Sequence, residues 1–334
     1  MNRTHNHAFQ SLLAGQIKEF LAAKRALGKS FRCEEKVLRL LDHYLIEQQV
    51  EALEHITPEL VESFLGSRPR HSSKSYNHLL STLRRFFDWL ELRKLISDSP
   101  VRVPPRRVTS HRIPFIFNAD QARLLLDAAV QLPNRSTAPN RGATYRMIFA
   151  LLYALGLRVG EATRLQIRDV DFQRDLLIIR ETKFSKTRLV PFGPRLCAAL
   201  KDYIRQQTEQ YGALALEQPV FSFSRATARH RPVNTNTVSW TFHQLVQKLA
   251  LDIPPGVSPP HLHCLRHSFA VGTLLHWYRT GIDPSRRLIH LSTFMGHVCP
   301  SSTVVYLTIT PELLRSANQR FEQCAAPILM EVKS

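Results

Sequence analysis

Two charged residues follow the most apolar stretch of the chain. Residues 145–157 are apolar nearly all round, which predicts a buried helix that Gly156 is placed to end. Arg158 comes next, and Glu161 is three positions further on. An unpaired buried charge is strongly disfavoured. Arg158 therefore either pairs with Glu161 and nearby carbonyls at a helix end, or projects from a rigid core to hold an oxyanion. Both interpretations stay open at this point.

A group of histidines opens a later predicted helix. His263 and Arg266 are three positions apart and so share one helical face. The spacing of His261, His263 and His267 would also suit a metal ion. However, the segment contains no H-E-x-x-H pattern and no nearby carboxylate, so it supports zinc only weakly. We therefore expect no metal site.

Three further residue types that could take part in catalysis lie in separate segments. Lys183 and Lys186 fall in a short turn between two predicted strands, over 175–182 and 188–192. His297 follows a glycine, and a tyrosine comes nine positions later at Tyr306. A single tyrosine on a helix is normally a core residue, so its position alone does not indicate chemistry.

Taken in order, these residues resemble the tyrosine recombinase, or phage integrase, family. The segments that carry the resemblance are ALGLRVGEATRLQIRDVDF (154–172), TKFSKTRLVPF (182–192), HCLRHSFAVGTLL (263–275) and MGHVCPSSTVVYL (295–307). The motifs cover about 145–310. The resemblance implies a catalytic set of Arg158, Lys183, His263, Arg266 and His297, with Tyr306 as nucleophile and Glu161 in support. Lys183 is assigned by aligning the turn with R-L-V-P, and Lys186 is the alternative.

The resemblance implies DNA strand cleavage through a covalent 3′-phosphotyrosyl link, with neither metal nor ATP. The guanidiniums of Arg158 and Arg266 can bind the non-bridging oxygens of a phosphodiester with forked hydrogen bonds. The two catalytic histidines could donate to the same oxygens or handle the tyrosine proton, and the lysine would protonate the leaving 5′-oxygen. The tyrosine would attack and store the bond as an ester. The sequence also has no G-x-x-x-x-G-K-[ST] loop for a nucleotide.

Apolar periodicity predicts a mainly α protein with a small antiparallel β-sheet. Helices are expected over 10–27, 35–45, 57–65, 72–96, 118–130, 145–157, 194–211, 235–250, 262–279, 284–296, 301–308 and 311–324. The prolines and arginines of 97–114 predict a stiff basic linker. We therefore divide the chain into a helical core-binding domain (1–96), this linker, and a mostly helical catalytic domain (115–334). The helix at 311–323 and the tail could dock on a neighbouring protomer or pack on their own chain.

The 334 residues carry a formal net charge of +18, from 45 Lys and Arg against 27 Asp and Glu. Such a charge on a folded chain favours a polyanion, with nucleic acid before membrane. No stretch is long and apolar enough to span a bilayer, and the N-terminus is too charged for a secretory signal. Five scattered cysteines without C-x-x-C indicate reduced thiols. We expect a cytoplasmic protein associated with the bacterial nucleoid.

The expected partner is a double-stranded DNA recombination site. Residues off the apolar stripe of 72–96 and residues of the linker are candidates for phosphate contacts. They are Lys74, Arg84, Arg85, Arg102, Arg106 and Arg107. The resemblance implies a homo- or hetero-tetramer assembled on two DNA sites. A type IB topoisomerase, with the same chemistry but no synapsis, is one alternative, and a non-catalytic DNA-binding accessory protein of the same fold is another.

Overall fold

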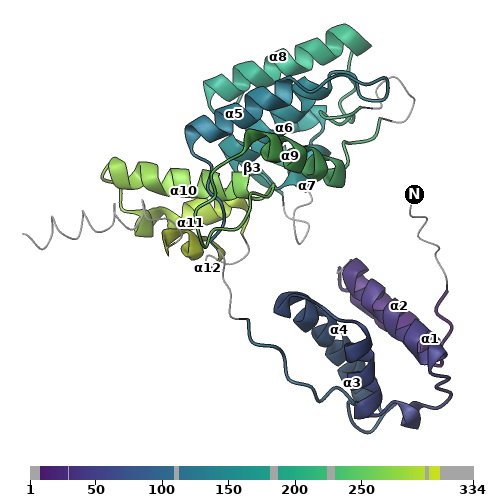
Figure 1. Cartoon of the computed structure of the whole chain (residues 1–334). Helices are drawn as coiled ribbons and strands as arrows, with labels where there is room; N and C mark the ends of the chain where they lie inside the picture. The colour runs from purple at the N-terminus through teal and green to yellow at the C-terminus, as the bar shows by residue number, and fades with distance from the viewer. Residues whose placement is uncertain are drawn as a thin grey trace, which may run out of the picture. The chain divides into compact units, whose positions relative to one another are not determined.

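The computed structural model describes residues 8–28, 30–108, 113–180, 187–223, 230–297 and 301–308. The chain divides into two compact units, Met1–His111 and Arg112–Ser334. Both are mostly helical, and the second carries a small antiparallel sheet (Figure 1). The predicted fold class is therefore confirmed. Among the described residues, no helix is both long enough and apolar enough to cross a membrane.

The first unit is a helical bundle around one apolar core. Its elements are α1 (Ala14–Ala26), α2 (Arg32–Glu47), η1 (Leu53–His55), α3 (Pro58–Ser67) and α4 (Ser73–Leu92). The side chain of Thr57 accepts a hydrogen bond from the Leu60 backbone at the start of α3 and so caps this helix. The predicted apolar stripe of α4, from Tyr76 to Leu90, is buried against α1 and α2.

Part of the basic segment after α4 packs on the first unit. Val101 is buried in its core and Val103 lies against that core. Arg84 of α4 donates a hydrogen bond to the Val103 carbonyl oxygen. Asn77 exchanges two hydrogen bonds of 2.8 Å with the Arg106 backbone. The segment thus packs along α4 as far as residue 106, where the sequence predicted a linker without packing.

The second unit is built around α6. Its helices are α5 (Ala119–Val130), α6 (Arg141–Leu155), α7 (Val159–Arg164), η2 (Ile167–Asp169), α8 (Pro194–Tyr211), α9 (Thr235–Leu249), α10 (Cys264–Arg279), α11 (Pro284–Met295), α12 (Ser301–Val304) and η3 (Val305–Thr308). Helix α6 packs against α5, α8 and α10, which explains why its sequence is apolar nearly all round (Figure 1). The helix starts at Arg141, not at 145, because Asn140 turns the chain with a left-handed backbone.

The sheet contains β1 (Val170–Asp171), β2 (Leu176–Ile179) and β3 (Arg188–Pro191) in the order β1-β2-β3, all antiparallel. Leu177 pairs with Val190, and both side chains are buried. The sequence predicted β2 and β3 but missed β1, which is only two residues long. The β2–β3 turn at 181–186, with Lys183 and Lys186, lies outside the described residues.

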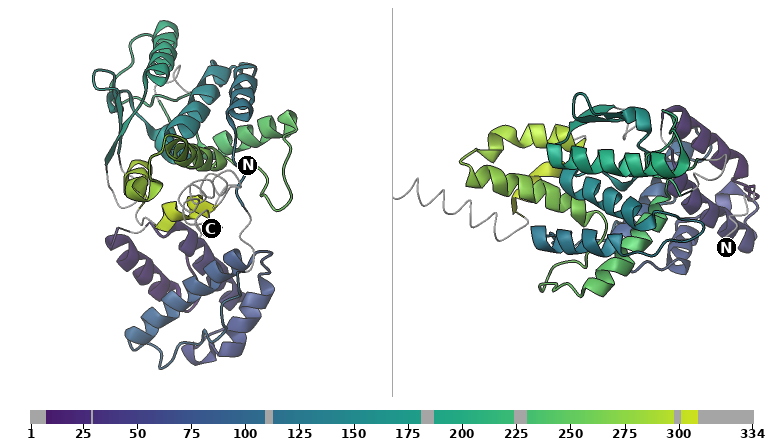
Figure 2. Two further views of the ribbon diagram at one scale, coloured as in Figure 1. Left: turned by 90° about the vertical axis from the view of Figure 1, so that its left-hand side faces the viewer. Right: turned by 90° about the horizontal axis from the view of Figure 1, so that it is seen from above.

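A smaller cluster joins α10, α11 and the segment that carries Tyr306 (Figure 2). Val271 and Leu274 of α10 pack there with Met295 of α11. Helix α11 ends at Gly296, whose φ of +68° is a left-handed conformation that glycine adopts without strain. This ending brings the C-terminus of α11 beside α7 and β3, where the candidate site lies. The helix predicted at 311–323 lies outside the described residues.

Candidate active site

Three arginines from three different elements converge on the C-terminus of α11. Each donates one hydrogen bond to one of three successive carbonyl oxygens. The pairs are Arg188 Nε to Phe294 O at 2.9 Å, Arg266 Nη2 to Met295 O at 2.7 Å, and Arg158 Nη2 to Gly296 O at 2.8 Å. The last carbonyls of a helix have no intrahelical partner and carry partial negative charge, so the guanidiniums satisfy and neutralise them.

Arg266 is the most deeply buried of these arginines, with 1 % of its surface exposed. Its Nη1 donates to the carbonyl oxygen of Gly156 at the end of α6, so it joins two helix C-termini. Burial, followed by the charge of Arg158, lowers the pKa of Arg266 to about 10, which still leaves it protonated at neutral pH. Its Nε has no hydrogen-bond partner among the described residues. A buried cation with an unused donor is suited to an anion.

Glu161 lies between two of the guanidiniums. Arg158 Nη1 donates to its Oε1 at 2.8 Å, and Arg188 donates to Oε1 and Oε2 at 2.9 and 2.8 Å. Burial alone would raise the pKa of the Glu161 carboxyl, but the bonds from Arg188 and Arg158 outweigh it and hold the pKa at about 2. Arg158 therefore pairs with Glu161, as one interpretation of the sequence held. Its side chain is still 32 % exposed.

Three histidines lie in the same region and are held neutral. The protein packed around each ring, and then the charge of Arg266, lowers the pKa of His263 and of His297 to about 4. Burial, and then the neighbouring His263, lowers the pKa of His267 to about 3. The rings of His263 and His267 meet edge to face with centroids 4.7 Å apart. A neutral imidazole can accept one proton and donate another, so these rings can exchange protons at neutral pH.

Tyr306 is buried, with 2 % of its surface exposed. Its hydroxyl lies 2.9 Å from Nδ1 of His267. Its ring is nearly parallel to that of His297, at a centroid distance of 6.4 Å and an angle of 19°. The Nδ1 of His297 is in turn 2.6 Å from the hydroxyl of Thr303. Burial raises the pKa of the Tyr306 phenol, against the opposing charges of Arg266 and Arg158.

The structure thus gathers most of the predicted set in one region of the second unit. Arg158, Glu161 and Arg266 meet at the end of α11, and the charges of Arg158 and Arg266 act on His263, His297 and Tyr306. The two candidate lysines lie outside the described residues. No cluster of three or more His, Cys, Asp or Glu residues in the described part of the chain could hold a metal ion.

Sequence reasoning missed two residues of this region. Arg188 was used only to align the turn, although a charged residue at the start of an otherwise apolar strand was a usable signal. His267 was weighed only as a metal ligand, although it lies one turn beyond His263 on the same helical face. Both contacts join segments far apart in sequence, so a local pattern could single out the residues but not their partners.

The candidate DNA-contacting residues differ in their exposure and in their contacts with the rest of the protein. Lys74, Arg85, Arg102, Arg106 and Arg107 are exposed. The Arg106 guanidinium lies 3.8 Å from the ring centroid of Tyr76. Arg84 is half-buried through its bond to the segment beside α4. Arg85 donates from Nε to the Ser81 carbonyl oxygen and lies 3.8 Å from Glu34, so Arg84, Arg85 and Arg106 have structural contacts in addition to any contact with DNA.

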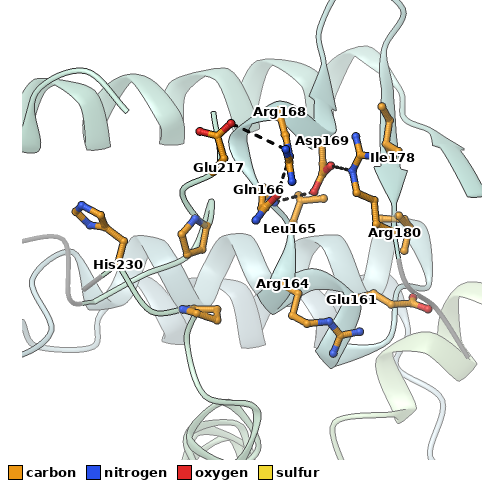
Figure 3. A pocket seen from close by; sticks show the side chains of 13 residues that line it. Glu161, Arg164, Leu165, Gln166, Arg168, Asp169, Ile178, Arg180, Glu217 and His230 are labelled. Carbon is orange, nitrogen blue, oxygen red and sulfur yellow. Dashed lines mark hydrogen bonds and ion pairs between the residues drawn. The ribbon is translucent and has the colours of Figure 1, made fainter. Parts of the chain in front are cut away.

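A pocket of about 350 Å³ adjoins the site through Glu161 (Figure 3). Its charged lining residues are of both signs, and most are paired. Arg180 Nε bonds Asp169, and Arg168 lies 3.9 Å from Glu217. These pairs leave little unbalanced charge in the pocket.

The arrangement suits transfer of a phosphoryl group. Two guanidiniums can bind an anionic centre, neutral imidazoles can move protons, and a phenol can serve as nucleophile. Residues 116–312 match the phage integrase family, and residues 10–94 match the phage integrase N-terminal SAM-like domain. The chain belongs to the phage integrase family, whose members are the tyrosine recombinases. It is a site-specific integrase/recombinase, so the predicted family and enzyme class are confirmed.

Two curated relatives show how far the likeness extends. The integrase/recombinase y4rB of Sinorhizobium fredii is 32 % identical over 312 residues, which are 92 % of this chain and 96 % of that protein. The tyrosine recombinase XerC of Pediococcus pentosaceus is 26 % identical over 253 residues, which are 75 % of this chain and 77 % of that protein. Both alignments extend across the two units.

Solved structures share the fold at low sequence identity. A lambda integrase dimer bound to a COC′ core site is 18 % identical, with a TM-score of 0.61, over 87 % of this chain and 96 % of that one. A lambda integrase tetramer bound to a Holliday junction is 17 % identical, with a TM-score of 0.57, over 86 % and 80 %. The XerH recombinase bound to palindromic difH substrate is 16 % identical, with a TM-score of 0.61, over 96 % and 90 %.

Proposed function

We propose that this recombinase cuts and rejoins duplex DNA through a covalent 3′-phosphotyrosyl intermediate on Tyr306, without metal or ATP. The observation that carries the proposal is the convergence of Arg158 and Arg266 at the end of α11, with their charges acting on the buried Tyr306. Attack of the phenol on phosphorus forms the ester and expels the 5′-hydroxyl. The 5′-hydroxyl of a second strand reverses the step, so the bond energy is kept.

The two arginines would bind the non-bridging oxygens of the scissile phosphate. Arg266 offers the buried Nε that has no partner in the described chain, and Arg158 is open enough to turn a donor toward DNA. Fixed donors of this kind stabilise the charge of the transition state without reorganisation, and removing one typically costs about 10²–10³-fold in rate. His263 and His297 would donate hydrogen bonds to the same oxygens.

The proposed general acid is Lys183, with Lys186 as the alternative. Its role would be to protonate the 5′-oxygen as that oxygen leaves. Both lysines come between β2 and β3 in sequence, and Arg188, two residues after Lys186, bonds Glu161. The strand that follows the turn is thereby fixed to the arginine site. This supports a lysine on the turn as the group that reaches the leaving oxygen.

We propose that both domains hold the duplex, with the basic segment 97–114 between them. The exposed Lys74, Arg85 and Arg107 are suited to phosphate contacts. The +18 charge makes the affinity strongly dependent on salt. The dimer and tetramer seen for lambda integrase on DNA support an assembly of two to four protomers on paired sites. With such a substrate, we propose that the protein acts on the nucleoid, in the cytoplasm.

The test uses sheared genomic DNA from the source organism as the probe, in a buffer with EDTA. The protein is incubated with the fragments, denatured with SDS, and the DNA that stays attached to protein is sequenced. We expect wild-type protein to retain fragments that share one site, and Tyr306→Phe to retain none. Retention by Tyr306→Phe, or none by wild type, would contradict the proposal. A nicked duplex of the recovered site then serves as the substrate for kinetics.

A further inference from the structure

The nucleophile of the proposed reaction already has a partner. Among the described residues, the 2.9 Å contact with Nδ1 of His267 is the only hydrogen bond that the Tyr306 hydroxyl makes. The ring centroids lie 5.4 Å apart. His267 is in the first turn of α10, one residue after Arg266, and Tyr306 comes from η3. The contact therefore joins two segments separated by 39 positions in sequence.

The surroundings of His267 favour its neutral form. The titratable and charged groups that act on it are His261 and His263, just before and at the start of α10, and Arg266 of α10. From the segments packed against it come Tyr306, in direct contact, and His297, whose charge is coupled to that of His267. A neutral imidazole has one lone pair, and the Tyr306 phenol has one proton to donate.

We propose that His267 holds the Tyr306 hydroxyl through Nδ1 and accepts its proton when the phenol attacks phosphorus. This rests on the proposed function, and it assigns a role that the predicted catalytic set leaves to other histidines. It fixes the tautomer, because Nδ1 must carry the lone pair and Nε2 the proton. His267 touches a reacting atom, so it would be a catalytic residue.

The step balances as follows. The bond from Tyr306 Oη to phosphorus forms while the Oη–H bond breaks and its proton passes to Nδ1 of His267. The bond from phosphorus to the 5′-oxygen breaks, and that oxygen takes a proton from the general acid on the β2–β3 turn. On rejoining, the 5′-hydroxyl attacks phosphorus and returns its proton to the general acid, the bond from phosphorus to Oη breaks, and His267 returns its proton to the departing Oη.

The charges at the site make this transfer depend on DNA. Without DNA, burial, the neighbouring His263 and His261, and then Arg266 all oppose a positive charge on the His267 imidazole. A phosphate anion bound between Arg158 and Arg266 offsets their charge, and this favours the imidazolium. The tyrosine is thereby kept protonated until a phosphate occupies the site. The arrangement couples activation of the nucleophile to binding of the substrate.

The experiment compares His267→Asn with wild type on the nicked duplex of the recovered site. Asparagine places an amide near the position of Nδ1, so it can keep the hydrogen bond but cannot accept the proton. We expect DNA affinity and melting temperature to stay near wild type while adduct formation slows about 10²-fold. His267→Gln, whose amide extends toward Nε2, should be at least as slow. His276→Asn, an exposed histidine of the same helix, is the matched control and should react at the wild-type rate.

Two further measurements separate proton transfer from a structural role. Between pH 6 and pH 8 the wild-type rate should vary little, whereas the rate of His267→Asn should rise up to tenfold per pH unit, because solvent must take the proton. A substrate with sulfur in place of the 5′-oxygen needs no general acid. This substrate should restore the cleavage rate of Lys183→Ala and leave the cleavage rate of His267→Asn low.

The role of His267 and the proposed function are tested by different outcomes. A His267→Asn protein that cleaves as fast as wild type, or faster, overturns the role of His267. So does restoration by the 5′-sulfur substrate, or a flat pH dependence in the variant. Absence of any adduct with wild-type protein overturns the proposed function instead, so the two failures are distinguishable.

Discussion

Arg188 and Glu161 form a two-pronged ion pair, with Nη1 2.9 Å from one carboxylate oxygen and Nη2 2.8 Å from the other. Arg188 is the first residue of β3, and Glu161 lies in the first turn of α7. The same carboxylate also accepts a bond from Arg158. The pair therefore ties the strand that follows the lysine turn to one of the two proposed phosphate-binding arginines.

Replacing Arg188 with Gln should slow cleavage more than it weakens DNA binding. Glu161 would lose its forked partner, and Arg158 would lose the alignment that the shared carboxylate imposes. We expect adduct formation to fall about tenfold or more. Unfolding should become easier by about 3 kcal/mol, since breaking a buried pair leaves a charge behind. The rate is measured under single-turnover conditions, and stability by denaturant unfolding.

Arg188→Lys keeps the positive charge but loses the forked bonds to both carboxylate oxygens. Its cleavage rate and stability should fall between those of wild type and Arg188→Gln. Arg205→Gln, which breaks two exposed ion pairs on α8, is the control and should match wild type in both measurements. Wild-type cleavage by Arg188→Gln would show that the pair does not position Arg158.

The low pKa of Glu161 predicts a pH dependence of stability. The pKa is lowered from 4.5 to about 2 in the folded protein, so the carboxylate stabilises the fold above about pH 4.5. That contribution is lost as pH falls toward 2. Between pH 5 and pH 3, wild type should lose about 2 kcal/mol more free energy of unfolding than Glu161→Gln. Parallel pH profiles for the two proteins would mean that the ion pair does not hold Glu161 charged.

The contact between His297 and Thr303 should orient the imidazole. Nδ1 of His297 and the Thr303 hydroxyl are 2.6 Å apart. Thr303→Val removes the hydroxyl at nearly constant shape, so we expect cleavage to slow about tenfold with DNA affinity unchanged. Thr303→Ser keeps the hydroxyl and should restore most of the rate. Equal rates for the Val and Ser variants would rule out this role for the hydroxyl.

Two arginines of the first unit should give opposite results. Arg84 donates to the Val103 carbonyl oxygen, so Arg84→Gln should lower the melting temperature of the protein. Arg107 is exposed and makes no hydrogen bond or ion pair with a described residue. Arg107→Gln should leave melting unchanged and reduce the slope of log affinity against log salt by about 1, because one phosphate contact is lost. A lower melting temperature for Arg107→Gln, together with a smaller salt slope for Arg84→Gln, would contradict both assignments.

Much of this fold follows from periodicity in the sequence. The buried stripe of α4 has helical spacing, and the mostly apolar run of α6 is too long for a typical strand, so both helices are well predicted. Two details depend on tertiary context instead. The strand β1 is too short to leave a pattern of its own, and it exists only because β2 lies beside it. The prolines of the segment after α4 are typical of a linker, but Val101 in that segment is buried in the core of the first unit.

The site shows the same division. Arg158 and Tyr306 could be found because their spacing to other residues resembles a known family. The partners Arg188 and His267 could not, because a hydrogen bond between β3 and α7, or between α10 and η3, leaves no trace in local sequence. The convergence of three arginines on the end of α11 also depends on how four elements pack together. That packing cannot be inferred from the amino-acid composition.

The central claim is that Tyr306 carries DNA on its phenolic oxygen. The direct measurement is mass spectrometry of the SDS-resistant adduct formed in EDTA on the recovered site, after digestion with nuclease and protease. We expect a peptide containing Tyr306 whose mass is increased by a nucleotide joined through its 3′-phosphate, and we expect no such peptide from Tyr306→Phe. A nucleotide on any other residue, or a 5′-linked one, would contradict this claim.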